Sequence, residues 1–172
     1  MELSQLAAKA KKGDDNAFAK LIEKKKDNLY RIAYSYVKNQ EDALDIVSET
    51  VFKAYTNIGT LKNPDYFYTW LTRITINTSI DHIKKHSKTI PMELGTEQRD
   101  IELIQTDQEA TIDLYNSIDK LDEKLKTVII LKYLEDMTLS EVAETMERPL
   151  GTVKTFLNKA LKELRLTLKE VL

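Results

Sequence analysis

Residues 138–165 read TLSEVAETMERPLGTVKTFLNKALKELR, and this stretch decides the fold. Thr138 and Glu141 have the spacing of a capping box, which predicts that a helix begins here. The break at 147–150 contains Pro149 and ends that helix. Apolar residues then recur on one face of a last helix, namely Val153, Leu157, Ala160, Leu161, Leu164 and Leu168. The stretch is therefore predicted to form a helix, a turn and a second helix.

The composition of the whole chain favours the same class of structure. Its 172 residues include only four Gly and three Pro, and this scarcity favours long helices over a turn-rich sheet. Between 89 and 110 the helical periodicity fades, and acidic and polar residues dominate. We therefore predict an all-α fold of two small domains, 1–88 and 111–172, joined by a flexible acidic linker at 89–110.

Three helices are predicted in the first domain. Two of them cover 16–38 and 43–54 and are separated near Asn39. A loop of about ten residues is expected next, because turn-forming residues cluster there. They are Asn57, Gly59, Asn63 and Pro64. The third helix covers 65–85, and its predicted apolar residues are Phe67, Leu71, Ile74, Ile80 and Ile83.

The residue inventory excludes several classes of site. Without Cys the chain has no disulfide, thiolate zinc site or cysteine nucleophile. No run approaches the roughly 20 apolar residues that span a bilayer, and the N-terminus lacks a cleavage signal, so a cytoplasmic protein is expected. Because no glycine-rich phosphate loop, serine elbow or paired-carboxylate signature occurs, we predict neither enzyme activity nor a cofactor.

Charge is distributed unevenly, although the net charge is only -2. Residues 151–169 contain five basic side chains and Glu163 as the single acidic one. A DNA-reading helix needs an apolar face for packing and a polar or basic face for phosphates and base edges. The outward candidates are Thr152, Lys154, Thr155, Asn158, Lys159, Lys162 and Arg165. A solvated lysine face on a helical hairpin is the alternative interpretation.

The predicted helix over 65–85 also carries polar and aromatic residues along or near one side. They are Tyr66, Thr69, Trp70, Arg73, Asn77 and Lys84. Single-stranded bases stack on aromatic rings while cations hold the phosphates. Because aromatic residues at helical spacing usually belong to a core, we assign Phe67 and Trp70 a structural role. Arg73 and Asn77 are the stronger functional candidates.

A metal site is the remaining possibility on this helix. His82 and His86 are four residues apart, so one metal ion could contact both, with Asp81 as a possible third ligand. A helical metalloenzyme built on these three residues is one alternative for the whole chain. Since the sequence indicates no clear third ligand, no metal site is predicted.

Two blocks of the sequence resemble a known family. Residues 42–55, DALDIVSETVFKAY, and 70–85, WLTRITINTSIDHIKK, resemble region two of extracytoplasmic-function (ECF) sigma factors of RNA polymerase. Residues 121–165, which begin LDEKLKTVIILKYLEDM, resemble region four of the same family. The overall texture is similar to the sigma-V-like branch, which answers lysozyme or cell-envelope damage.

The resemblance implies a role for each group of candidate residues. The clamp coiled coil of the polymerase β′ subunit would be bound by Asp42, Asp45, Ser48, Glu49 and Phe52. An unpaired base of the minus-ten element would be captured by Asn57, Lys62, Asn63, Tyr66, Arg73 and Asn77. The last helix, with Thr152, Lys154, Thr155, Asn158, Lys159 and Lys162, would read the minus-thirty-five element as duplex.

The resemblance also implies partners and a regulatory setting. These are core RNA polymerase, through the β′ clamp and the β flap, promoter DNA, and a membrane-anchored anti-sigma factor. The genes controlled would form a cell-envelope or extracytoplasmic stress regulon. Phe156 and Leu161 depart from the family pattern, since many relatives have arginines on this helix. The main alternative is a stand-alone helix-turn-helix regulator that binds duplex DNA without polymerase.

Overall fold

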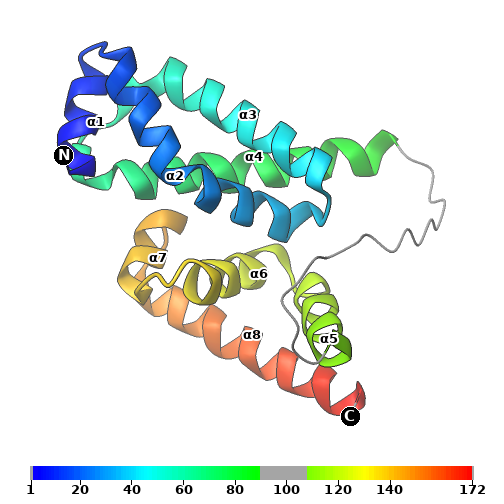
Figure 1. Ribbon diagram of the computed structural model, residues 1–172. Coiled ribbons are helices and arrows are strands. Elements are labelled where there is room, and N and C mark those ends of the chain that lie inside the picture. The colour runs from blue at the N-terminus through cyan, green and yellow to red at the C-terminus, as the bar shows by residue number, and fades with distance from the viewer. Residues whose placement is uncertain (1, 90–107, 172) are drawn as a thin grey trace. The chain divides into compact units, whose positions relative to one another are not determined.

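The computed structural model describes residues 2–89 and 108–171, with side chains described for 2–87 and 113–169 (Figure 1). It divides into two compact units, Met1–Thr96 and Glu97–Leu172. Every regular element in the described ranges is helical, which confirms the all-α prediction. Most of the predicted linker, at 90–107, lies outside the described residues, and the predicted domain boundaries remain predictions.

The first unit is built from four α-helices, of which α2, α3 and α4 pack on one another (Figure 1). The helices are α1 (Leu3–Lys11), α2 (Asp15–Val37), α3 (Gln40–Asn57) and α4 (Phe67–Thr89). The predicted break near Asn39 is present, because α2 ends at Val37 and Asn39 caps α3. Its Oδ1 accepts hydrogen bonds from the backbone N–H groups of Glu41 and Asp42.

Helix α1 was not among the predicted elements. Leu6, Ala7 and Ala10 are buried on one side of it and join the core of the unit. Their spacing is a helical signal, but three small or medium apolar residues in a lysine-rich stretch are a weak one. Packing against α2 therefore determines this helix more than its own sequence does.

The inner face of α4 differs from the prediction. Phe67 and Leu71 are buried as expected, but Ile83 is exposed. The buried positions include four hydroxyl residues, Thr72, Thr75, Thr78 and Ser79. The hydroxyls of Thr75 and Ser79 donate to backbone carbonyls one turn earlier, at 2.9 and 2.8 Å, so the helix satisfies them internally. The prediction relied on large apolar residues and therefore missed the small hydroxyl residues that form part of the buried face of α4.

The segment between α3 and α4 is more ordered than the predicted loop. It contains two short 3-10 turns, η1 (Ile58–Thr60) and η2 (Pro64–Tyr66). Leu61 lies between them and is buried in the core of the unit. The predicted loop therefore consists of two short turns and their connections, and one buried leucine fixes it to the helices beneath it.

The described residues of the second unit form four α-helices and one π-helical turn. They are α5 (Gln108–Asp119), α6 (Glu123–Ile129), the turn η3 (Ile130–Leu134), α7 (Leu139–Met146) and α8 (Leu150–Val171). Helix α5 begins three residues before the predicted boundary at 111. Leu125, Ile129, Ala160 and Leu164 form a core between α6 and α8.

Some apolar residues of this unit lie at its surface. Leu114 on α5 and Leu134 at the end of η3 are exposed. The α-helical hydrogen-bonding pattern changes at Leu134, because the amide of Glu135 bonds to the carbonyl of Ile130, five residues back. Leu134 is turned outward as a result. None of the described helices is both long and apolar enough to cross a membrane.

The predicted capping box at the start of α7 is present. Thr138 Oγ1 accepts from the N–H of Glu141 at 3.2 Å, and Glu141 Oε2 accepts from the N–H of Thr138 at 2.7 Å. We predict that Thr138→Ala lowers the free energy of unfolding by about 1 kcal/mol, because a helical N–H loses its partner. Urea unfolding followed by circular dichroism measures this change.

Ser140→Ala is the matched control for this variant. It also removes one exposed hydroxyl from the first turn of α7, but the hydroxyl takes no part in the capping box. Equal unfolding midpoints for the two variants and the native chain would contradict the role assigned to the cap.

Candidate functional site

The helix-turn-helix unit is formed by α7, the residues 147–149 and α8. Glu147 ends α7 in the left-handed region, with φ of 54°. The N–H of Arg148 then bonds back to the carbonyl of Ala143 at 3.0 Å, so the turn closes tightly. The carbonyl of Pro149 accepts from the N–H of Val153 at 3.1 Å and begins the hydrogen bonding of α8. This geometry sets how α8 leaves α7.

One face of α8 belongs to the core of the second unit. Val153, Ala160 and Leu164 are buried. Phe156 and Leu161 are half-buried and pack against the core that α8 shares with α6. These two residues, which depart from the family pattern, therefore serve packing in this chain.

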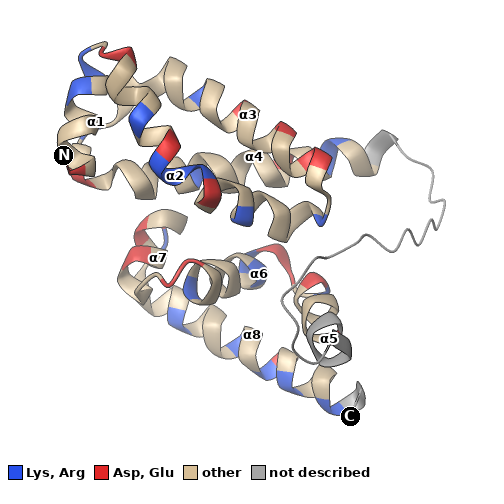
Figure 2. Ribbon diagram, viewed as in Figure 1, with Lys and Arg blue, Asp and Glu red and all other residues tan. Residues whose placement is uncertain are grey.

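The opposite face of α8 is basic and exposed. Its exposed members are Lys154, Thr155, Asn158, Lys159, Lys162 and Arg165. At 3.6 residues per turn these positions fall within an arc of about 140°. Figure 2 shows Lys and Arg distributed along the length of α8. The helix therefore presents one cationic surface that is continuous over several turns.

The two threonines of the predicted DNA-binding set are less available than the lysines. Thr155 Oγ1 donates to the carbonyl of Gly151 at 3.0 Å, and Thr152 is half-buried. A hydroxyl that already donates to its own helix still has lone pairs that accept hydrogen bonds. Lys154, Asn158 and Lys159 are exposed in the first turns of α8.

Helix α3 presents an acidic face with an aromatic residue in it. Asp45, Ser48 and Glu49 are exposed, and Phe52 is 67% exposed on the same side. Asp42 differs from them, because its side chain is two-thirds buried, at 33% exposure, beside His82. The predicted set therefore shares one helix face, but its first member lies partly beneath the surface.

Glu49 on this face is held in an ion pair. Its Oε1 lies 2.8 Å from Lys53 Nζ, which also donates to Thr78 Oγ1 on α4 at 3.2 Å. The hydrogen bond from Lys53 lowers the pKa of the Glu49 carboxyl below its ordinary value, with smaller contributions from the charges of Lys53, Lys85 and His82. The carboxylate is consequently anionic at neutral pH.

The turns between α3 and α4 contain four of the predicted minus-ten residues. Lys62 and Tyr66 are exposed, and Tyr66 keeps 48% of its surface accessible. Asn57 Nδ2 donates to the carbonyl of Lys53 at 2.9 Å, and Asn63 Oδ1 accepts from the N–H of Asp65 at 3.0 Å. Both asparagines are exposed, and both also have a structural bond that orients them.

The remaining candidates lie on α4. Arg73 and Asn77 are one helical turn apart; Asn77 is exposed and Arg73 is half-buried. Phe67 is buried and packs its ring 5.9 Å from that of Trp70, which is itself packed on the core. The structural role assigned to these two aromatic residues is confirmed.

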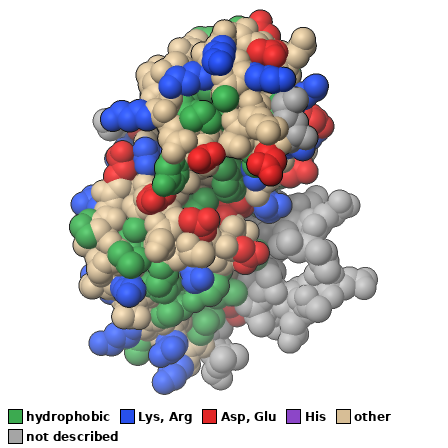
Figure 3. Space-filling view, turned by 90° about the vertical axis from the view of Figure 1, so that its left-hand side faces the viewer, with side chains coloured by type: hydrophobic (Ala, Val, Ile, Leu, Met, Phe, Trp, Pro, Cys, Tyr) green, Lys and Arg blue, Asp and Glu red, His purple; other side chains and the backbone are tan. Residues whose placement is uncertain are grey.

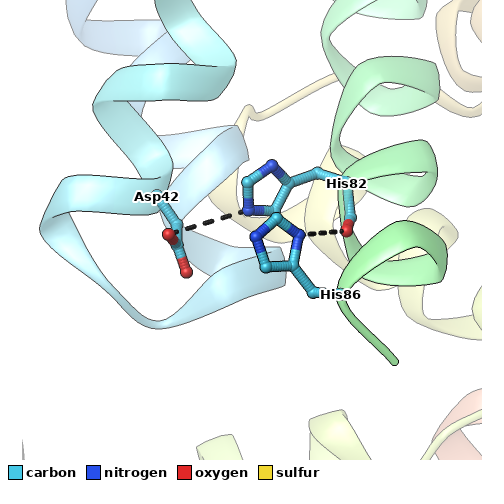
Figure 4. Close-up of side chains that lie close together, drawn as sticks. All are labelled: Asp42, His82 and His86. Carbon is cyan, nitrogen blue, oxygen red and sulfur yellow. Dashed lines mark hydrogen bonds and ion pairs between the residues drawn. The ribbon is translucent and has the colours of Figure 1, made fainter. Parts of the chain in front are cut away.

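The structure brings an unexpected residue to the histidine pair on α4. Asp42, from the start of α3, lies beside His82 and His86, whereas Asp81 is not part of this group (Figure 4). Asp81, named above only as a possible third ligand, is not in the group because adjacent residues on a helix point to different sides. Forty residues separate Asp42 from His82, so helical spacing could not indicate the contact.

Apolar side chains also remain at the surface. Figure 3 shows some of them among charged groups on one face. In the second unit the exposed apolar residues include Tyr133, Leu150 and Leu166. Exposed apolar residues of this kind are common in proteins that bind other macromolecules, although scattered single ones are ordinary.

The chain matches two family models that cover most of its length. Residues 21–89 match Sigma-70 region 2, and residues 111–164 match Sigma-70, region 4. The first range contains α3, the turns, α4 and most of α2, and the second contains α7, the turn after it and most of α8. Since the N-terminal unit matches Sigma-70 region 2, the alternative of a stand-alone helix-turn-helix regulator that works without polymerase loses its support.

Two curated relatives match this chain over most of their length. The chain is 40% identical over 146 residues to the RNA polymerase sigma factor SigV of Bacillus subtilis (strain 168), a match that covers 83% of this chain and 86% of SigV. It is 32% identical to the ECF RNA polymerase sigma factor SigW of the same organism, over 99% of both chains.

A solved structure confirms the fold. The sigma factor RpoE, in complex with the anti-sigma factor NepR from Bartonella quintana, aligns with a TM-score of 0.71 and 20% sequence identity. The alignment covers 88% of this chain and 96% of RpoE. Sigma factors are initiation factors and not enzymes, which agrees with the prediction that the chain has no catalytic site. The chain belongs to the ECF class of the sigma-70 family of RNA polymerase sigma factors.

Proposed function

We propose that this sigma factor divides promoter-specific initiation among three surfaces, each on the outer side of a packed helix. The observation that carries the proposal is the sorting of side chains on α8, whose apolar residues are buried while its cations are exposed on one arc. The region 2 unit takes residues 1–88, the linker 89–110 and the region 4 unit 111–172.

Helix α8 reads the minus-thirty-five element in the major groove. Lysines along the exposed arc hold phosphates and fix the position of the helix, while Asn158 and the lysines near it reach base edges. The tight turn at 147–149 supports this role because it holds the start of α8 at a fixed angle to α7. Thr152 and Thr155 contribute acceptor oxygens to the same surface.

The turns η1 and η2 and the outer side of α4 capture the melted minus-ten strand. Flipping one base costs a few kcal/mol of stacking and pairing, so the protein must bind the opened strand better than the duplex. Tyr66 provides an exposed ring for stacking, and Lys62 and Arg73 provide cations for phosphates. Asn57, Asn63 and Asn77 provide amides for the edges of an unpaired base.

The outer face of α3 binds core polymerase. Phe52 is an exposed aromatic side chain of the kind that anchors protein interfaces, and Asp45, Ser48 and Glu49 surround it with acceptor groups. Such a face suits a basic partner helix of the β′ clamp. Asp42 belongs to the same set, and the region 4 unit contacts the β flap.

The factor acts in the cytoplasm under the control of a membrane-anchored anti-sigma factor and serves a cell-envelope stress regulon. RpoE, which has the same fold, is bound to an anti-sigma factor in its solved structure. An inhibitor that covers the polymerase-binding face of α3 would block initiation without touching DNA.

The two DNA-binding units, joined by a tether, gain effective concentration once polymerase is bound.

Two lysines of α8 give the sharpest test of duplex recognition. We predict that Lys154→Ala and Lys159→Ala each weaken binding of the holoenzyme to promoter duplex. Each should also reduce the steepness of log K against log salt by about 0.9, because one fewer phosphate is neutralised. Filter binding over a salt series measures both effects.

Lys124→Ala is the control for these lysines, because Lys124 is an equally exposed lysine on α6 away from the basic arc. It removes the same charge from the chain and should leave the salt slope as it is. If both α8 variants keep the native slope, α8 does not lie against DNA phosphates in the way proposed.

Asn77 allows promoter opening to be separated from initial binding. We predict that Asn77→Ala impairs opening more than binding, because its proposed partner is exposed only after melting. Permanganate footprinting of unpaired thymines reports opening, and filter binding reports the initial complex. Asn116→Ala, which alters an exposed asparagine on α5, is the control. An equal loss in both steps for Asn77→Ala argues against capture of a melted base.

A further inference from the structure

Three side chains with metal-binding atoms meet at one end of the first unit. Asp42 comes from the start of α3, and His82 and His86 come from the far part of α4 (Figure 4). One ligand atom from each residue lies within 4.8 Å of the others. Asp42 Oδ1 and His82 Nε2 are 3.7 Å apart, which is too long for a hydrogen bond.

The carboxylate is oriented by a residue outside the group. Asn39 caps α3 with its Oδ1, and its Nδ2 donates to Asp42 Oδ2 at 3.0 Å. The other carboxylate oxygen, Oδ1, is therefore the one that faces His82. Hydrogen bonds of this kind, made to the atom that a metal does not use, are typical of metal-ligating side chains.

The second histidine is oriented in a similar way. His86 Nδ1 lies 2.9 Å from the backbone carbonyl of His82, and the two rings stack with centroids 4.0 Å apart. A carbonyl oxygen only accepts hydrogen bonds, so Nδ1 is the protonated nitrogen in this contact. In the neutral ring the lone pair is then on Nε2, which is the atom that would ligate a metal.

The first histidine has an unsatisfied nitrogen. His82 is only 13% exposed, and its Nε2 is buried with no hydrogen-bond partner among the described residues. Buried polar atoms in folded proteins nearly always have a partner, and an orphan needs a physical explanation. A bound cation at this point would supply the missing partner for His82 Nε2 and would be faced by Asp42 Oδ1 as well.

We propose that Asp42, His82 and His86 form a binding site for a divalent transition-metal ion of the zinc class. Two imidazole nitrogens and one carboxylate favour zinc and its neighbours over Mg²⁺ and Ca²⁺, which prefer sets of oxygen ligands. Three protein ligands leave a fourth position for water. Metal–ligand bonds of about 2.1 Å place tetrahedral ligands roughly 3.4 Å apart, so small side-chain rotations bring the three atoms into range.

The ion would cross-link two helices whose contacting residues are far apart in the sequence. It would tie the first turn of α3 to the last described turns of α4 and offset the charge of Asp42. The site itself is inferred from geometry and does not depend on the proposed function. Asp42 is shared with the proposed polymerase-binding face, so metal occupancy would change the charge that this face presents.

Zinc titration of the full-length, tag-free chain after treatment with a chelator tests the site. Isothermal calorimetry should show saturable binding of a single ion, and zinc should raise the thermal unfolding midpoint, because the ion binds the folded chain preferentially. Loss of an outer-shell hydrogen bond alone costs metal sites about 10–100-fold in affinity. Asp42→Asn and His86→Gln should therefore weaken zinc binding at least about tenfold.

The choice of variants separates this site from a simple histidine pair. Two histidines four apart on a helix bind metal weakly by themselves, and only the proposed site needs Asp42. Asp81→Asn removes the same charge from an exposed neighbour and should leave the affinity unchanged. His86 is exposed, so its replacement should not disturb the fold, and unfolding without metal checks this for each variant.

Either of two results would overturn the proposal. One is the absence of saturable zinc binding by the native chain. The other is zinc binding by Asp42→Asn as tight as that of the native chain, which would reduce the site to the histidine pair. The Co²⁺ form gives an independent check, since tetrahedral ligation produces strong visible absorption that should disappear in Asp42→Asn and persist in Asp81→Asn.

Discussion

Burial of one face of α8 is the constraint on which the second unit depends. Val153, Ala160 and Leu164 pack the helix against its neighbours, and this packing decides which residues are left outside. Because the same helix forms the core and carries the basic arc, its rotation about its own axis cannot change without loss of the core. The surface proposed to face DNA is thus held by apolar contacts on the opposite side.

In the first unit the burial of one helix face also decides which residues stay exposed, but the buried face of α4 is partly polar. Threonines and a serine on the inner face of α4 donate to their own helix or accept from Lys53, so polar groups pack where large apolar ones were expected. Small side chains of this kind allow helices to approach closely. The outer faces of α3 and α4, which we propose to bind polymerase and the melted strand, share this packed support.

Much of the fold could be predicted from local signals. The capping box at Thr138, the break at Asn39 and the turn at Pro149 all depend on residues a few positions apart, and helical spacing located the two faces of α8. The failures share a physical cause. Leu61 and the helix α1 are ordered by contacts with distant parts of the chain, and Asp42 meets His82 across a gap of forty residues. Local periodicity contains no information about such contacts.

The candidate site residues show the same difference between what local spacing predicts and what depends on distant contacts. The arrangement of the α8 lysines followed from spacing alone, whereas the half-buried position of Asp42 and the ion pair of Glu49 with Lys53 required the packed unit. The predicted roles themselves came from family resemblance, because a cationic arc or an acidic face does not specify which macromolecule it binds.

The most direct test of the account is run-off transcription with purified chain and core RNA polymerase on a library of genomic promoter fragments. Core polymerase without the chain is the control. The account predicts transcripts that start at specific promoters only when the chain is present, with shared sequence elements near positions minus ten and minus thirty-five. Duplex binding by the chain alone, without any promoter-specific transcript in the presence of core, would contradict it.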